Sequence, residues 1–121
     1  MQIASALALQ IGDEGAQRTT LSRAYYACFH RARAYAQACG AAAPKDGSAH
    51  VAVRRFVATR DAEIESNLRR LHSWRKNADY DVPYPNGTLE SDVQASLEIA
   101  EGVILAIDAL PIRPIGAIQK D

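Results

Sequence analysis

Apolar residues recur at helical spacing between residues 61 and 78, at Ile64, Leu68, Leu71 and Ala78. Steps of three and four residues place side chains on one face of an α-helix, so the pattern predicts an amphipathic helix here. Arg75 falls on that same face, where the pattern favours leucine. A guanidinium directed at a core or an interface is costly unless it is paired and hydrogen-bonded. Arg75 therefore indicates a structural ion pair or a functional site.

Polar residues surround Arg75 along this helix. Asp79 lies four residues on, at a spacing that lets the two side chains meet, and His72 lies one turn back. We expect an Arg75–Asp79 ion pair, which either pins this helix to residues 18–39 or forms part of a site. Asn77 is a candidate binding residue and Tyr80 a candidate site residue, although plain packing would also explain Tyr80. We expect the partners of His72 to be local.

The segment from about Arg18 to Cys39 is predicted to be a central helix with two nearly opposite stripes. The apolar stripe consists of Leu21, Tyr25, Cys28, Ala32, Tyr35 and Cys39. The polar stripe consists of Arg23, Tyr26, His30, Arg33 and Gln37. An imidazole and arginines on one face suit acid–base and anion-stabilising roles on a phosphodiester. The alternative is a wet interface, where Tyr26 and His30 hydrogen-bond across a dimer.

The remaining segments complete an all-α, up-and-down bundle of four to five helices. We expect a short helix over Met1–Ile11, a break over Gly12–Gly15, and a third helix that Ser48 caps and His50 opens. A last helix begins near Thr88 or Ser91, where Ser91-x-x-Gln94 has capping-box form, and Pro111 ends it. The predicted organisation is one domain over residues 1–110 and a tail over residues 111–121.

Several classes of site lack support in the sequence. The three histidines lie on three predicted helices, and no His-x-x-x-His or Cys-x-x-Cys pair occurs, so we expect no metal and no cofactor. No apolar run approaches the roughly 20 residues of a membrane span. Residues 1–10 lack the features of a secretory signal, and the two cysteines are too far apart in one helix to pair. A cytoplasmic location is the default expectation.

The net charge is zero, but the charges are unevenly distributed. Between Arg18 and Lys76 there are twelve basic and four acidic residues, against two basic and ten acidic residues elsewhere. Such a basic region can attract phosphate groups. Alternatively, the acidic last helix neutralises it by packing alongside.

Two motifs together resemble those of the HEPN superfamily. Residues 22–30, Ser-Arg-Ala-Tyr-Tyr-Ala-Cys-Phe-His, are similar to a Ser-Arg-x-Tyr-Tyr-Ala-x-Phe-His pattern. Residues 75–80 are similar to an Arg-x-x-Ala-Asp-Tyr pattern, and His50 between the two motifs also matches. The resemblance implies a HEPN-like helical bundle, usually a homodimer, in toxin–antitoxin or defence systems. It also implies frequent pairing with a minimal nucleotidyltransferase.

The chain departs from the RNase-active relatives in one respect. These relatives carry Arg-x(4–6)-His at the corresponding helix end, whereas the positions after Arg75 that fall in this window are Tyr80, Asp81 and Val82. Either His30 or His50 replaces the missing histidine, or the protein binds without cleaving. His30 is the better candidate for the catalytic imidazole, because Tyr26 and the two arginines share its stripe. We expect a toxin–antitoxin or defence component that acts on or binds RNA or a nucleotide through Arg75. The alternative is a non-catalytic module that docks a nucleotidyltransferase and is modified at Tyr80.

Overall fold

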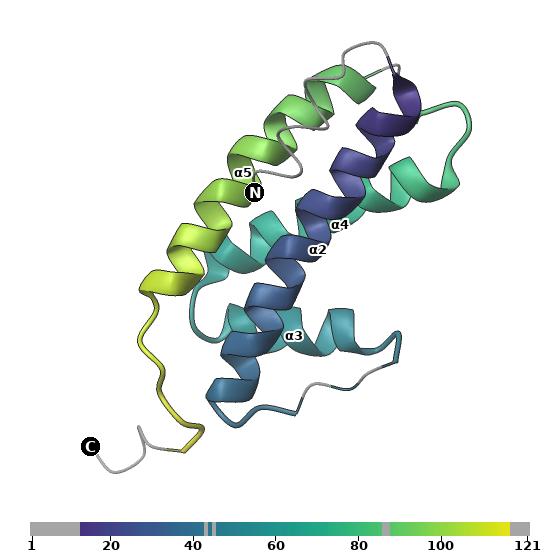
Figure 1. Cartoon of the computed structure of the whole chain (residues 1–121). Helices are drawn as coiled ribbons and strands as arrows, with labels where there is room; N and C mark the ends of the chain where they lie inside the picture. The colour runs from purple at the N-terminus through teal and green to yellow at the C-terminus, as the bar shows by residue number, and fades with distance from the viewer. Residues whose placement is uncertain (1–12, 43, 45, 86–87, 117–121) are drawn as a thin grey trace.

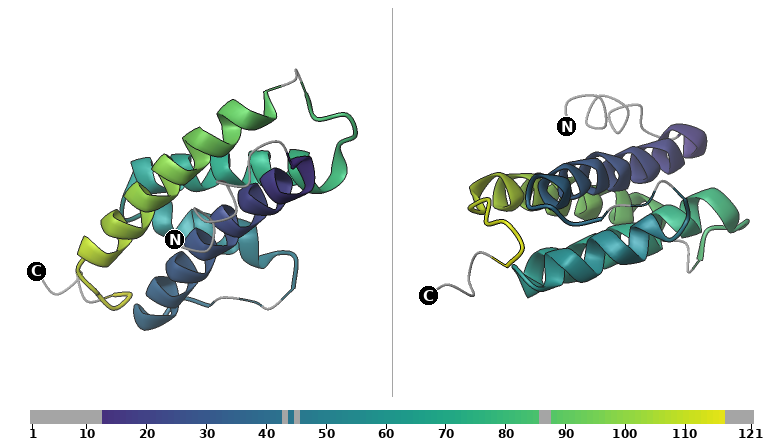
Figure 2. Two further views of the ribbon diagram at one scale, coloured as in Figure 1. Left: turned by 45° about the horizontal axis from the view of Figure 1, so that its top comes forward. Right: turned by 90° about the horizontal axis from the view of Figure 1, so that it is seen from below.

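Four helices in two layers make up the part of the chain that the structure describes. The computed structural model describes residues 13–42, 44, 46–85 and 88–116. Its helices are α2 (Glu14–Ala38), α3 (Ala49–Ala58), α4 (Ala62–Tyr80) and α5 (Leu89–Ala109), and the described residues contain no strand. α2 and α5 run side by side in the same direction, and α4 runs against both (Figure 1). Seen from below, in the right-hand view of Figure 2, α2 and α5 form one layer over α3 and α4. The predicted all-α bundle is confirmed.

The apolar stripes predicted for α2 and α4 form the centre of the core. Every residue of the α2 stripe is buried, as are Ile64, Leu68, Leu71 and Ala78 of α4. Val53 and Val57 of α3 and Val103 and Ile107 of α5 close the same core. Helical periodicity alone therefore identified the buried faces of α2 and α4, two of the three helices that hold the candidate site.

The predicted break over Gly12–Gly15 is wrong where the structure describes it. α2 begins at Glu14, and the Asp13 carboxylate accepts a hydrogen bond from the Ala16 backbone N–H at 3.1 Å. Aspartate at this position satisfies one of the unpaired N–H groups of the first turn, which outweighs the helix cost of Gly15. The predicted helix over Met1–Ile11 lies outside the described residues.

α3 and α4 differ in how they are capped, and the side-chain cap predicted at Ser48 does not form. Asp61 caps α4 by accepting from the backbone N–H groups of Glu63 and Ile64 at 2.9 and 3.0 Å. Ser48 precedes α3 but makes no side-chain cap, because its hydroxyl donates to the Asp46 carboxylate instead. A side-chain cap therefore stabilises the first turn of α4 but not that of α3.

The last helix begins at the first of its two predicted starts. Thr88 precedes α5, and the Ser91 hydroxyl donates to the Thr88 carbonyl, so the capping box predicted at Ser91 does not form. Residues 81–85 leave the helical path, and the Val82–Pro83 peptide bond is cis. After α5, the chain lies against the end of α2, where Tyr35 donates to the Pro111 carbonyl and the Ile115 N–H donates to the Cys39 carbonyl.

Candidate functional site

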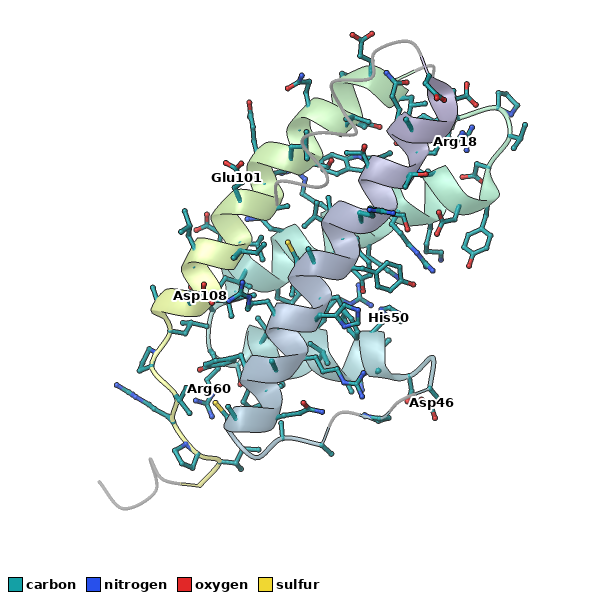
Figure 3. All side chains as sticks on the ribbon, in the orientation of Figure 1. Arg18, Asp46, His50, Arg60, Glu101 and Asp108 are labelled. Carbon is teal, nitrogen blue, oxygen red and sulfur yellow. The ribbon has the colours of Figure 1, made fainter. Side chains whose placement is uncertain are left out.

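Histidine and tyrosine rings from α2, α3 and α4 gather beside the middle of α2, around His50 (Figure 3). The His50 and His72 rings are stacked with their centroids 5.1 Å apart, and the Tyr25 ring lies within 5.6 Å of both. Tyr26 stacks on His30, with centroids 5.9 Å apart, and meets His50 edge-on at 6.2 Å. We call Tyr25, Tyr26, His30, His50 and His72 the ring cluster.

Arg75 brings a positive charge to the edge of the ring cluster. Its Nη2 donates a 2.7 Å hydrogen bond to the Tyr26 hydroxyl, and its guanidinium carbon lies 5.1 Å from the centre of that ring. Its Nε lies 3.0 Å from Asp79 Oδ2, so the expected ion pair is present, although that N–H lacks hydrogen-bond alignment with the carboxylate. The Arg75 side chain is 15% exposed and Asp79 30% exposed. The guanidinium thus links α4 to α2 through a neutral hydroxyl.

Arg54 of α3 supplies a second positive charge. Its Nε donates to the His50 carbonyl at 3.3 Å. Burial first, and then Arg75 and Arg54, lower the pKa of His50 below its ordinary value. Burial and then Arg54 lower the pKa of His72 to about 4. Both imidazoles are therefore neutral at pH 7, and the two arginines carry the positive charge of the site.

The Tyr25 hydroxyl orients His50. It shares a hydrogen bond with His50 Nδ1, and burial raises the pKa of Tyr25 well above its ordinary value, so the phenol keeps its proton. Because Nδ1 is occupied whichever group donates, Nε2 is the ring nitrogen that can meet a ligand. A neutral imidazole beside arginines suits hydrogen bonding to an anion or proton transfer at a phosphodiester.

The structure brings together some of the predicted site residues and separates others. Arg75, Asp79, Tyr26, His30 and His50 lie in or against the ring cluster, with His30 exposed to solvent.

The remaining predicted residues lie at its margins. Tyr80 is 67% exposed, with its ring centre 5.6 Å from the Arg75 guanidinium carbon. Arg23 is exposed and Arg33 is half-buried on the same helix. Asn77 points away, toward the Tyr84 hydroxyl.

Sequence reasoning missed Tyr25 and Arg54 as site residues and misjudged the partners of His72. The expectation that His72 has only local partners is wrong, because its ring meets Tyr25 of α2 and His50 of α3. Tyr25 was assigned only to the core stripe, yet its hydroxyl reaches the site. The available signal for Arg54 was its spacing of four residues from His50 in one predicted helix. The spacing of three residues had placed His72 beside Arg75, but its contacts with the other two helices depend on helix packing.

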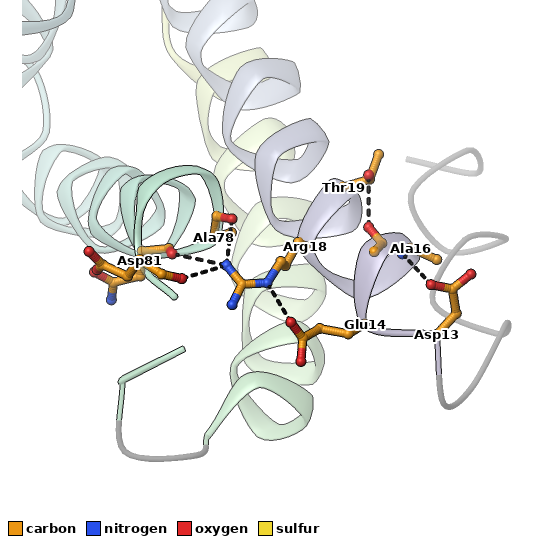
Figure 4. A network of polar contacts seen from close by, with 9 residues as sticks. Asp13, Glu14, Ala16, Arg18, Thr19, Ala78 and Asp81 are labelled. Carbon is orange, nitrogen blue, oxygen red and sulfur yellow. Dashed lines mark hydrogen bonds and ion pairs between the residues drawn. The ribbon is translucent and has the colours of Figure 1, made fainter. Parts of the chain in front are cut away.

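Arg18, a third arginine, holds the C-terminal end of α4, next to the site. Arg18 of α2 reaches the last turn of α4, where its Nη1 donates to the carbonyls of Ala78 and Asp81, both at 2.8 Å (Figure 4). Its Nε is paired with Glu14 at 3.0 Å. The terminal carbonyls of a helix lack intrahelical partners and carry partial negative charge, so a guanidinium stabilises them. Arg18 therefore helps to position the turn that contains Asp79 and Tyr80.

Comparison with known proteins identifies the family. The HEPN domain family matches residues 8–110, which is most of the chain. The chain belongs to the HEPN family. This HEPN domain matches no curated protein and no solved structure.

The described part of the HEPN domain has neither a metal-ligand cluster nor a membrane-spanning helix. It holds no group of three or more His, Cys, Asp or Glu side chains placed to bind a metal ion. No helix in residues 13–116, within the ranges that the structure describes, has both the length and the apolar character to cross a membrane. Cys28 and Cys39 are buried free thiols.

Proposed function

We propose that this HEPN domain is an RNA-directed component of a toxin–antitoxin or defence system and that it works in the cytoplasm. Arg75 contacts a phosphate of the RNA, assisted by Arg54. His50 and His72 supply neutral imidazoles beside that phosphate. Tyr26 holds the Arg75 guanidinium in place through its hydroxyl. No cofactor takes part.

One observation carries the proposal: two arginines and three imidazoles from three helices converge on one site. Burial and, after it, the arginines lower the pKa values of His50 and His72. The arginines also offer charged N–H donors of the kind that phosphate oxygens accept. The excess of basic residues between Arg18 and Lys76 gives the surrounding surface an attraction for a polyanion. A histidine after Arg75 is not required for such a site, since His50 reaches it from α3.

RNA binding and cleavage assays in the presence of a metal chelator test this proposal. Wild-type protein should bind RNA, and Arg75→Ala should weaken binding strongly. Arg31→Ala is a matched control, because Arg31 is an exposed α2 arginine paired with Asp108 of α5. If wild-type protein binds no RNA, or Arg31→Ala and Arg75→Ala behave alike, the proposal fails.

The same assays separate an enzyme from a binding protein. Removal of a general acid–base group typically costs about 10²–10⁴-fold in rate. Chelator-resistant cleavage that His50→Ala abolishes would make this protein a metal-independent ribonuclease. RNA binding without cleavage would make it a non-catalytic member. His30→Ala and His72→Ala report which other imidazole takes part.

We also propose that the protein is a homodimer, with α2 near the two-fold axis. Ala27, Ala34 and Ala38 are exposed on α2 beside Arg23 and His30. These small residues permit close approach of a second helix, and the polar ones can hydrogen-bond across it. Light scattering at micromolar concentration should give twice the mass of one chain. A monomer under these conditions would contradict the dimer.

The exposure of Tyr80 favours a second candidate function, in which a cognate nucleotidyltransferase docks and modifies this residue. The side chain is 67% exposed beside the Arg75 guanidinium, so its hydroxyl is accessible and an arginine is at hand for an incoming phosphate. Mass spectrometry after co-expression with a nucleotidyltransferase from the same operon should show one added nucleotide, absent in Tyr80→Phe. An unmodified Tyr80 in a stable complex would exclude the modification.

A further inference from the structure

The outer side of the α3–α4 pair holds a groove next to the ring cluster. It has a volume of about 220 Å³ and is lined by Val51, Arg54, Arg55, Ala58, Glu65 and Arg69. Three arginines face one glutamate, so the groove is positive. It shares Arg54 with the candidate site, but the proposed function does not use its other lining residues.

The groove leads directly to the ring cluster. Arg54 lines the groove and also donates to the His50 carbonyl. On α4, Arg69, His72 and Arg75 follow one another at steps of three residues, so each lies about one turn from the next. A chain of phosphate groups that leaves Arg75 can therefore pass His72 and enter the groove.

The cations of the groove are available to a ligand. Arg55 is exposed. The Arg69 side chain is 62% exposed, and its pairing with Glu65 is long, with 3.8 Å between Nη2 and Oε1. A long ion pair whose arginine is exposed contributes little to stability, although the Glu65 side chain is only 20% exposed, so a phosphate can compete with the carboxylate for Arg69.

We infer that this groove binds the phosphodiester backbone of the RNA strand next to the nucleotide at the ring cluster. Arginine forks match phosphate oxygens, and backbone contacts set the register of a strand without reading its bases. The apolar Val51 and Ala58 offer no hydrogen bonds to base edges, so the groove binds without sequence preference. This inference rests on the proposed function, because it assigns the second part of the same RNA site.

The salt dependence of RNA binding tests the inference. Fluorescence anisotropy would compare a twelve-nucleotide RNA with a dinucleotide, over a series of salt concentrations, for wild type, Arg55→Gln/Arg69→Gln, Glu65→Gln and Arg70→Gln. Each lost phosphate contact lowers the slope of log K against log salt by about 0.7 for a single strand. The double variant should therefore lose about 1.4 in slope for the long RNA and keep its dinucleotide affinity.

Two further variants make the test specific. Arg70→Gln removes one positive charge at the residue adjacent to Arg69. Arg70 lies outside the groove, over the Trp74 ring, with its guanidinium carbon 5.2 Å from the ring centre. It should keep the wild-type slope. Glu65→Gln removes the competing carboxylate and should tighten binding of the long RNA several-fold.

Three outcomes would overturn the inference while leaving the proposed function intact. The double variant and Arg70→Gln could show the same slope, the long RNA could bind no better than the dinucleotide, or Glu65→Gln could weaken binding. Absence of any RNA binding by the wild type would instead overturn the proposed function and this inference with it. Thermal melts that match wild type establish that the exposed substitutions leave the fold intact.

Discussion

Arg18 and Arg75 are alike in burial and in their local ion pairs but bind different partners. Both side chains are 15% exposed, and each pairs with a carboxylate four residues away on its own helix. Arg18 directs its Nη1 at backbone carbonyls that end α4. Arg75 directs its Nη2 at a tyrosine hydroxyl and sits beside imidazoles. The partner, rather than the degree of burial, distinguishes a structural arginine from one that a ligand can recruit.

Replacement of Arg18 should have the largest effect, and it should act on stability. Arg18→Ala removes charged hydrogen bonds to the end of α4 and the contact with the Tyr84 ring. Charge-assisted bonds contribute about 1.5–3 kcal/mol, so we expect the free energy of unfolding to fall by about 2–3 kcal/mol in urea titration. Arg31→Ala, which removes an exposed ion pair, should cost less than about 1 kcal/mol. Equal losses of stability for Arg18→Ala and Arg31→Ala would contradict a structural role of Arg18.

Replacement of Arg75 should affect RNA affinity more than stability. A charged hydrogen bond to phosphate contributes about 1.5–3 kcal/mol, so Arg75→Ala should weaken binding roughly 10- to 100-fold. The free energy of unfolding should fall by only about 1 kcal/mol, because Asp79 without its partner is 30% exposed and water can solvate it. Arg75→Lys should rescue little, since lysine lacks the planar fork. Anisotropy measures the RNA affinity and urea titration the stability of the same samples. If Arg75 were purely structural, Arg75→Ala would lower the stability more than the RNA affinity.

The imidazoles beside Arg75 should make this region sensitive to acid. The pKa of His72 is about 4 in the folded protein, below its ordinary value of 6.5, so the unfolded chain binds a proton first as pH falls. The contribution of His72 to the free energy of unfolding is fully present above about pH 6.5 and is lost as the pH falls toward 4. We expect a loss of about 1–2 kcal/mol, reduced by solvent screening of a partly exposed ring. In His72→Gln, the free energy of unfolding should depend less on pH between about 6.5 and 4. The same pH dependence as in wild type would show that His72 is not the group that titrates.

Replacement of the two partner carboxylates should have the smallest effect. Glu14→Gln and Asp79→Asn each remove one ion pair at a spacing of four residues, so each should change stability by about 0.5 kcal/mol or less. Only Asp79→Asn should alter RNA affinity, and it should increase it, because the guanidinium of Arg75 no longer shares its charge with a carboxylate. Equal RNA affinities for the two variants would show that Asp79 does not restrain Arg75.

The sequence by itself determined the helices, their buried faces and the exceptional position of Arg75. Local rules suffice for this, because helical spacing decides which residues share a face and which carboxylate an arginine can reach. The same rules went wrong at Asp13, where an N-cap bond starts α2 inside the predicted break, and at Ser91, whose hydroxyl bonds to Thr88.

Only the tertiary structure decided which faces meet. His30, His50 and His72 come from three helices, and Arg18 lies far in sequence from the carbonyls that it bonds. Periodicity specifies the direction of a side chain around its own helix, but not the neighbouring helix or the depth at which the two cross. The ring cluster, the partners of Arg54 and the Arg18 contacts depend on that crossing, because helix packing sets the separations between their atoms.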